Sequence, residues 1–444
     1  GVVNTVLKTD FEGLTAEFTY GGEDGVDATE LSGALEFGIK SDDDRTNLSI
    51  FASYFGRDPI WASERPFSAN ADLRSQLPAN WQADATASGL FNNTSITSSW
   101  GIFDRFSAGT VTVNGTAITN AAGQFHIRPS ALGGCAAQLG NNLRPATTST
   151  RPQELRYNVN QDTTTQNGVD RYNAFAFLNH EFDRGLELFA EGGFYLADSV
   201  GYREAAPMLG AVPIVIPASN YYNPFGPVGS PNRLPVTNAP AGGLDLVLGS
   251  LTGTAAYRPI DAGPRKTEVE NLSTRALVGL RGDFANWDWE TALLYTMANS
   301  EDKENRVSNT LFQQALARST PDAYNPFNGG CIPDFAAGDC TPSLAATIED
   351  ITVPVFRRNT TTLASWDLKL SRPDLLSIWA GDIGAAIGVE VRRETIRDDR
   401  DPRQDGTVTF DDIINNTPPT VVNDLQGNSG SLDTRGSRNV QSAY

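Results

Sequence analysis

The sequence contains no run of about 18 or more apolar residues, the length that a membrane-spanning helix needs. Its mean hydropathy is negative, so we expect no transmembrane helix. A β-barrel can span a membrane without one, because its strands alternate apolar and polar residues. This absence therefore excludes helical membrane proteins and leaves soluble and barrel-forming classes open.

Basic residues are also scarce. The 444 residues include 34 Lys and Arg against 53 Asp and Glu, which gives a formal net charge of -19 at pH 7. Binding to nucleic acids depends on clustered Lys and Arg that neutralise phosphates. We therefore expect no nucleic-acid partner, whereas basic partners and divalent cations remain compatible with this charge.

Residues that commonly carry out catalysis are few. The only two histidines, His126 and His180, lie far apart, and no motif of a serine hydrolase, a zinc protease or a phosphate-binding loop occurs. Pairs of carboxylates could serve a glycosidase, but with so many carboxylates in loops a solvated surface is the favoured interpretation. We therefore expect neither an enzyme nor a bound cofactor or metal.

The residues that are abundant favour an all-β protein. They include 41 Gly, 25 Pro, 22 Phe and 12 Tyr. Alternating apolar and polar residues, the pattern of strands with one apolar face, recur along the whole chain. The alternating stretches lie in residues 14–20, 31–39, 48–54, 171–183, 186–197, 272–283, 289–297, 364–370 and 383–392. A further strand begins at Ser437, so we expect about ten antiparallel strands.

The connections between these strands differ in length. Tight turns, at Asp183-Arg-Gly185, at Phe284-Ala-Asn-Trp287 and around Ser371-Arg-Pro-Asp374, alternate with long loops. The long loops lie near residues 57–170, 201–270, 300–360 and 397–435. Short turns on one side and long loops on the other are typical of transmembrane barrels. The alternative is a soluble sandwich, in which the apolar faces are buried.

The alternation also predicts which side chains would face lipid. In the sixth strand, Ala276 and Val278 are expected to face outward, whereas Arg275 and Arg281 are expected to face inward. Aromatic residues near strand ends, such as Phe284, fit the aromatic girdles of transmembrane barrels.

Several segments resemble a known family. Gly1-Val-Val-Asn-Thr-Val-Leu-Lys8, followed by a Phe-Glu-Gly turn and an alternating strand, resembles the junction of plug and barrel in TonB-dependent outer-membrane receptors. Phe51-Ala-Ser-Tyr-Phe-Gly-Arg-Asp-Pro59 resembles the third barrel strand and loop entry of large members. Tyr222-Asn-Pro-Phe225 and Tyr324-Asn-Pro-Phe327 resemble motifs of their outer loops.

The resemblance implies a domain organisation. Residues 1–10 would end a plug domain, and residues 11–444 would form the N-terminal part of a transmembrane β-barrel. Complete members carry a plug with a TonB box and about 22 barrel strands, so we expect an internal fragment. A small closed barrel ending at the aromatic Tyr444 is the competing interpretation.

The resemblance also implies active import across the outer membrane of a Gram-negative bacterium. A scarce nutrient, such as a siderophore, haem, cobalamin or an oligosaccharide, would bind outer loops and plug, and TonB would supply the energy. The expected partners are TonB, this nutrient, outer-membrane lipid and lipopolysaccharide. The candidate ligand-binding residues are Tyr222, Phe225, Tyr324 and Phe327, with anchoring of the loop base as the alternative role. The alternatives to import are a passive or adhesive outer-membrane barrel and a secreted all-β binding protein or hydrolase.

Cysteine is rare, with three residues in the chain. The spacing of Cys331 and Cys340 is compatible with a small disulfide loop in an oxidising compartment, the alternative being two free thiols. Cys135 has no evident partner. Because Cys331 and Cys340 lie in an expected outer loop, we predict that they form a disulfide.

Overall fold

The computed structural model describes residues 11–105, 111–113, 115–117, 125–126, 156–208, 214–248, 257–329, 341–410 and 423–444. Residues 1–10, expected to end a plug, and the cysteines Cys135, Cys331 and Cys340 lie outside the described residues. The disulfide therefore stays a prediction. Within these ranges, no helix is long and apolar enough to cross a membrane.

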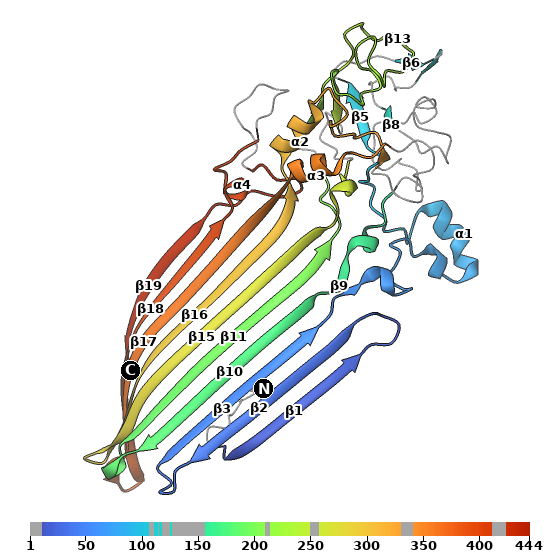
Figure 1. The fold of residues 1–444 in the computed structure, drawn as a ribbon. Helices are drawn as coiled ribbons and strands as arrows, with labels where there is room; N and C mark the ends of the chain where they lie inside the picture. Colours follow the sequence, from blue (N-terminus) through green and yellow to red (C-terminus); the bar gives the residue numbers. More distant parts are fainter. Residues whose placement is uncertain are drawn as a thin grey trace.

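One antiparallel sheet of ten strands dominates the described chain, as the alternation predicts. Figure 1 shows it as a tall curved sheet with its strands side by side in chain order. The strands are β1 (Gly13–Gly22), β2 (Thr29–Lys40), β3 (Thr46–Arg57), β10 (Gly168–Glu181), β11 (Glu187–Arg203), β15 (Arg265–Phe284), β16 (Trp287–Val307), β17 (Thr352–Ile378), β18 (Gly381–Arg400) and β19 (Thr434–Ala443). In the described chain β1 pairs only with β2, and β19 pairs only with β18. A small closed barrel requires a ladder between β1 and β19, and the described residues form none.

Short turns join the strands at one end of the sheet, the lower end in Figure 1. Between β15 and β16, Ala285 and Asn286 both have positive φ angles, of 55° and 67°. This is the two-residue hairpin turn whose twist matches that of the flanking strands. Between β10 and β11, Arg184 has a φ of 69°. Two of the three predicted tight turns are therefore confirmed.

The turn between β17 and β18 lies at Trp379-Ala380, so the prediction of a turn around Ser371-Arg-Pro-Asp374 is wrong. The register of the two strands shifts between Arg372 and Leu376. Proline lacks an N–H donor and often ends a strand, but at a bulge the missing donor falls outside the ladder. Pro373 therefore interrupts the pairing without ending the hairpin.

The long strands extend further toward the loops than the alternation predicts. β15 begins at Arg265 instead of residue 272, and β16 continues to Val307 instead of residue 297. In these added segments polar and charged residues occupy both faces, which removes the apolar signal. The loops are correspondingly shorter than expected.

The other described segments gather at the opposite end of the sheet (Figure 1) and form what we call the loop layer, residues 58–167, 204–264, 308–351 and 401–433 as far as they are described. Its α-helices in the described ranges are α1 (Ala79–Ser88), α2 (Asn309–Leu316), α3 (Ala345–Ile351) and α4 (Pro402–Asp405). Its short strands there are β4 (Ile60–Trp61), β5 (Ile102–Arg105), β6 (Thr112–Val113), β7 (Thr116–Ala117), β8 (Phe125–His126), β9 (Thr164–Gln166), β12 (Ile214–Ile216), β13 (Val236–Thr237) and β14 (Leu246–Leu248). β12, β14, β5 and β8 form a small sheet of their own.

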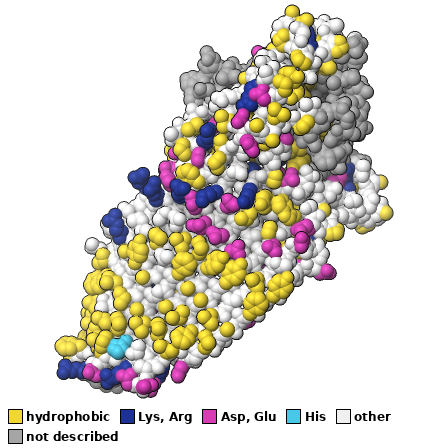
Figure 2. All heavy atoms as spheres, viewed as in Figure 1, with side chains coloured by type: hydrophobic (Ala, Val, Ile, Leu, Met, Phe, Trp, Pro, Cys, Tyr) yellow, Lys and Arg dark blue, Asp and Glu magenta, His cyan; other side chains and the backbone are white. Residues whose placement is uncertain are grey.

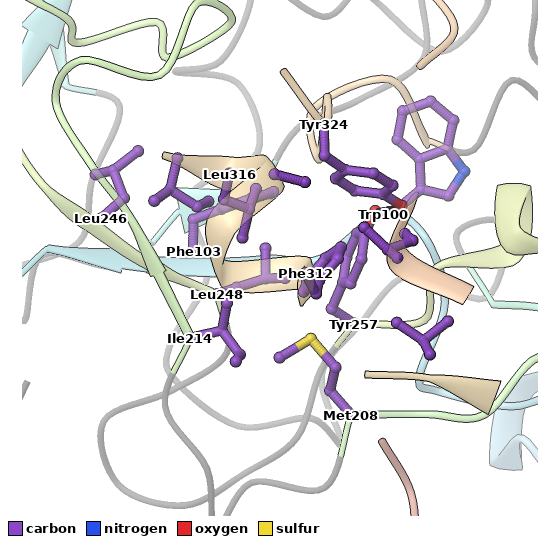
Figure 3. Packing of buried hydrophobic residues seen from close by; sticks show 14 of the residues in the cluster. Trp100, Phe103, Met208, Ile214, Leu246, Leu248, Tyr257, Phe312, Leu316 and Tyr324 are labelled. Carbon is purple, nitrogen blue, oxygen red and sulfur yellow. Dashed lines mark hydrogen bonds between the residues drawn. The ribbon is translucent and has the colours of Figure 1, made fainter. Parts of the chain in front are cut away.

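The hydrophobic core of the described chain lies in the loop layer and not against the large sheet. Figure 3 shows part of its packing. The cluster comprises Trp100, Phe103, Val111, Phe125, Met208, Ile214, Ile216, Phe225, Leu246, Leu248, Tyr257, Val307, Phe312, Ala315, Leu316, Tyr324, Ile351 and Phe410. Among these residues only Val307, at the end of β16, belongs to the large sheet. The core thus stabilises the loops, and the large sheet is held mainly by its own ladder.

Candidate functional site: a two-faced sheet and its loop layer

The large sheet has one apolar and one polar face. Successive side chains of a strand point to opposite faces, so the register assigns each residue to a face. We call the face that carries Val278 and its neighbour in β16, Leu293, the apolar face, and the face that carries Arg275 the polar face. Ala276 lies on the apolar face and Arg281 on the polar face, so the predicted separation of these residues is confirmed.

The apolar face is exposed, although it carries many large hydrophobic side chains. The exposed fraction is 73% for Phe18, 57% for Leu293 and 45% for Val278. Soluble monomers rarely expose a contiguous apolar surface of this kind, which marks contact with a membrane or another protein. Its large exposed side chains include Leu14, Phe18, Tyr20, Leu35, Phe37, Ile39, Ile50, Tyr172, Phe194, Val278, Phe284, Leu293, Tyr295, Trp366, Ile383, Ile387, Val389 and Val391.

Charged side chains border the apolar face at both ends, as Figure 2 shows. Near the turns, Arg45 Nη1 lies 2.8 Å from Asp183 Oδ1, and near the loop layer Arg358 Nε lies 2.7 Å from Glu301 Oε1. Between these limits, the apolar stretch of β16 runs from Trp287 to Met297. At a rise of about 3.3 Å per residue it extends about 33 Å, and at a tilt of about 45° it spans about 23 Å.

The polar face carries ion pairs that link neighbouring strands. Arg275 Nη2 of β15 lies 3.1 Å from Glu191 Oε2 of β11, and Arg357 Nε of β17 lies 2.9 Å from Asp398 Oδ1 of β18. Partly exposed pairs contribute little stability each, so their main effect is a hydrophilic wall. A pocket of about 440 Å³ opens on this wall near the turns and is lined by Glu187, Arg281, Asp283, Glu290 and Lys369, among others.

The chain reaches β1 from the polar face. The Phe11 N–H donates to Ser49 Oγ at 3.1 Å, and Asn47 Nδ2 donates to the Phe11 carbonyl at 3.3 Å. Both side chains belong to the polar face of β3, so Phe11 crosses over β2. Gly38 of β2 leaves room for this crossing, because a Cβ there would lie 1.9 Å from the Phe11 carbonyl oxygen.

The two Tyr-Asn-Pro-Phe motifs adopt the same turn in the loop layer. Asn223 Oδ1 accepts from the Phe225 N–H at 2.9 Å, and Asn325 Oδ1 accepts from the Phe327 N–H at 3.0 Å. Each asparagine also donates from its amide to a carbonyl of a neighbouring segment, at 2.9 Å in both copies. Asparagine suits this position because its side chain bonds the backbone two residues on, and proline presets the φ angle between them.

Aromatic packing joins the two motifs. The ring centroids of Phe327 and Phe103 lie 4.8 Å apart, those of Phe103 and Phe125 5.2 Å, and those of Phe125 and Phe225 5.2 Å. The Tyr222 hydroxyl donates, at 2.8 Å, to a backbone carbonyl just before the second motif. Loops that are far apart in the sequence therefore form one packed unit.

The sequence predicts ligand contact for Tyr222, Phe225, Tyr324 and Phe327, with anchoring of the loop base as the alternative. Tyr222, Phe225 and Tyr324 are 9%, 1% and 0% exposed, and Phe327 packs against the core cluster. In this arrangement all four make the contacts of anchoring residues. Ligand contact through them stays a prediction, and it would require the loops to rearrange.

Tyr324 belongs to a buried hydrogen-bonded chain. Its hydroxyl donates to Asp261 Oδ1 at 2.6 Å and lies 2.8 Å from the hydroxyl of Tyr257. Figure 3 shows both tyrosines within the core. Burial raises the pKa of Asp261 to about 6, although the hydrogen bond from Tyr324 acts in the opposite direction.

The loop layer is expected to become more stable as the pH falls from 7 to 5. The folded chain binds a proton at Asp261 near pH 6, whereas the unfolded chain binds it near pH 3.8, so protonation favours the folded form in this window. Hydrogen–deuterium exchange of residues 257–263, corrected for its intrinsic pH dependence, should be slower at pH 5. Asp261→Asn has no titrating group at this position, so its exchange should not slow between pH 7 and pH 5. Slower exchange at pH 5 in this variant would show that another group causes the pH dependence.

Gly329 is expected to tolerate no side chain. Its φ is +63°, and a Cβ there would lie 2.2 Å from Cη2 of the buried Trp100. Overpacking of this kind costs about 1 to 3 kcal/mol. Gly329→Ala should therefore destabilise the loop layer, measured by Trp fluorescence during urea unfolding. Gly25→Ala is the control, because Gly25 has a φ of +79° and open space around it. Its loss of unfolding free energy should be smaller, since it reflects backbone strain alone. Equal losses of unfolding free energy in the two variants would exclude a clash with Trp100.

Two buried polar centres of the loop layer were not predicted from the sequence. Asp424, which is fully buried, accepts hydrogen bonds from Ser308 and Thr310 at the start of α2. Arg258, 3% exposed, donates to the Thr97 carbonyl at 3.1 Å and stacks over a tyrosine ring. In the sequence, each looks like any charged residue of a polar loop.

The described residues contain no group of three or more His, Cys, Asp or Glu side chains that could hold a metal ion. Their candidate functional surfaces are the apolar and polar faces of the large sheet and the packed loop layer at one end of it. No protein-family model matches this chain, and no curated protein matches it either.

Proposed function

We propose that the chain is part of an outer-membrane receptor that imports a scarce nutrient with energy supplied through TonB. In this proposal the ten-stranded sheet is a section of a transmembrane barrel. Its apolar face contacts lipid, and its polar face lines the interior. The observation that carries the proposal is the exposed apolar face with charges at both ends.

The dimensions of the apolar face suit a bilayer. Transmembrane barrels have an outward apolar band about 25 Å tall, close to the span of about 23 Å for the apolar stretch of β16. The strands β15 to β18 have 20, 21, 27 and 20 residues and continue beyond this stretch. The loop layer would therefore stand clear of the lipid, where a nutrient can reach it.

The polar side suits a plug. Phe11 is anchored to Asn47 and Ser49 on the polar face, so Phe11 lies on the interior side of the proposed barrel. This position of Phe11 agrees with the resemblance of Gly1–Lys8 to the last strand of a plug. TonB would act on the receptor through that plug.

The two edge strands favour a barrel larger than ten strands. Lipid cannot satisfy unpaired N–H and C=O groups along β1 and β19, and each such group costs several kcal/mol in a bilayer. Further strands would pair with both edges, in line with the about 22 strands of complete members of the family that the chain resembles.

The test is uptake of labelled nutrients by the cells from which the protein comes. Ferric siderophores, haem, cobalamin and oligosaccharides are supplied separately to the parent strain, to a strain lacking this protein and to a strain lacking TonB. We expect uptake of one nutrient to be lost in both mutants. Loss in the first mutant with normal uptake in the second would favour a passive barrel. Recovery of the protein in the soluble fraction would favour a secreted binding protein or hydrolase.

A further inference from the structure

Arginine side chains gather on the apolar face just below the loop layer. On the half of this face nearer the loop layer, strands β16 to β19 carry five basic and two acidic residues, a local charge of +3 (5 − 2) in a chain of net charge -19. Figure 2 shows dark blue side chains above the hydrophobic band. We define the arginine patch as Lys303, Arg358, Arg393, Arg397 and Arg435, with the acidic residues Glu301 and Asp399 among them.

Two arginines of the patch are direct neighbours across the ladder. Arg397 of β18 is paired with Arg435 of β19, and like charges directly opposite one another destabilise a sheet. The polar face contains a comparable pair, Arg357 and Arg400. There Asp398 lies between them, with its carboxylate oxygens 2.9 Å and 3.0 Å from the two guanidinium groups.

No carboxylate of the described residues bridges the pair in the arginine patch. Arg397 Nη2 lies 3.4 Å from Asp399 Oδ1, but Arg435 forms no ion pair within the described chain. Arg393, further down β18, forms none there either. Arg393, Arg397 and Arg435 are exposed, so their N–H donors are accessible to a molecule that contacts this face. An anion between Arg397 and Arg435 would offset their repulsion as Asp398 does on the other face.

An apolar groove continues from the patch. It has a volume of about 780 Å³, and Tyr295, Trp366, Val391 and Arg393 are among the residues that line it. Arg393 thus borders both the groove and the patch. A ligand that fits both surfaces carries a negative charge at one end and hydrocarbon at the other.

We propose that the arginine patch binds the phosphate group of a lipid whose acyl chains lie on the apolar face. Arginine suits phosphate because its planar guanidinium group donates two parallel hydrogen bonds and keeps its charge. The inference rests on the proposed function, since it requires lipid against this face. The inference adds to the proposed function the strands, β16 to β19, and the residues of the arginine patch that would hold a charged lipid.

Lipid binding to the purified full-length protein in neutral detergent tests the inference, with native mass spectrometry as the measurement. The probes are phosphatidic acid, diacylglycerol with the same chains, and glycerol 3-phosphate, which has no chains. We expect phosphatidic acid to bind at least tenfold more tightly than either of the others. Each arginine near a charged lipid contributes about a fivefold change in affinity. The triple variant Arg358→Gln, Arg397→Gln, Arg435→Gln should therefore bind phosphatidic acid on the order of 100-fold more weakly.

The matched control is Arg392→Gln with Arg438→Gln, two sequence neighbours of the patch that lie on the polar face. It should bind phosphatidic acid like the unmodified protein, and an equal loss in both variants would overturn the inference. Equal binding of phosphatidic acid and diacylglycerol would exclude a phosphate site, and equal binding of glycerol 3-phosphate would indicate a site for soluble phosphate.

Labelling of Val278→Cys by a lipid-soluble reagent separates this inference from the proposed function. Labelling together with a negative lipid result would overturn the phosphate site alone. Absence of labelling in membranes would overturn the lipid-facing assignment of the sheet, and the phosphate site with it.

Discussion

Replacing Val278 by Arg is expected to lower the stability of the membrane-inserted protein by about 2 to 4 kcal/mol, the cost of a basic side chain at the bilayer midplane. Val278 lies within the apolar stretch of β15 and is 45% exposed on the apolar face. In the proposed barrel, its substitution would place a guanidinium group in hydrocarbon. The measurement is equilibrium unfolding by denaturant of the complete protein in lipid vesicles.

The matched control is Leu277→Arg, because Leu277 is the preceding residue and lies on the polar face. Its partner in β11 is Glu191, which an arginine can contact, so the expected change is within about 1 kcal/mol. Gly279, also on the polar face, is a poor control because a Cβ there would lie 2.2 Å from Cζ of Phe189. Equal losses at Val278 and Leu277 would indicate two buried faces and a soluble sandwich.

Replacing Asp424 by Ala is expected to destabilise the loop layer by about 3 to 5 kcal/mol, as does the removal of one partner from other buried ion pairs. The carboxylate accepts from Ser308 Oγ at 2.5 Å, from the Thr310 N–H at 2.8 Å and from Thr310 Oγ1 at 2.6 Å, and it pairs with Arg403. Its removal leaves the buried Ser308 hydroxyl and the partly buried donors of Thr310 without this acceptor. It also removes a negative charge from the N-terminus of α2.

The effect of Asp424→Ala should be local, because the large sheet has its own ladder of hydrogen bonds. Hydrogen–deuterium exchange should accelerate in residues 309–316 and stay unchanged in β11 and β15. Glu349→Ala is the matched control, since Glu349 is an exposed carboxylate on α3 of the same layer. Equal acceleration in both variants, or in the sheet strands, would contradict the role of Asp424 as a local anchor.

Much of the large sheet could be predicted from the alternation of apolar and polar residues. In β11, Leu188, Ala190 and Phe194 define one face without any knowledge of neighbouring strands. The alternation is less informative where both faces meet water, as between Glu301 and Val307, because the period-two signal depends on one apolar face. It also could not show that Pro373 occupies a bulge instead of a turn.

The loop layer could be predicted only in part. The repeat of Tyr-Asn-Pro-Phe marks two equivalent turns, because Asn and Pro restrict the backbone locally. The packing that joins them depends on Phe125, which lies 100 positions before Phe225, and on Phe103, which lies 224 positions before Phe327. No local sequence pattern reports contacts between residues so far apart. The same holds for Asp424, whose burial is set by α2 and Arg403.

The sequence by itself determined that the strands have an apolar and a polar side, because side chains alternate along any extended chain. It also determined the order of tight turns and long loops. Only the tertiary structure decided which surfaces are covered. The loops fold into a core of their own, and the apolar face of the sheet stays exposed along the described strands. The physical reason is that alternation is identical in a sandwich and in a membrane-facing sheet, whereas burial depends on which other segments pack against the face.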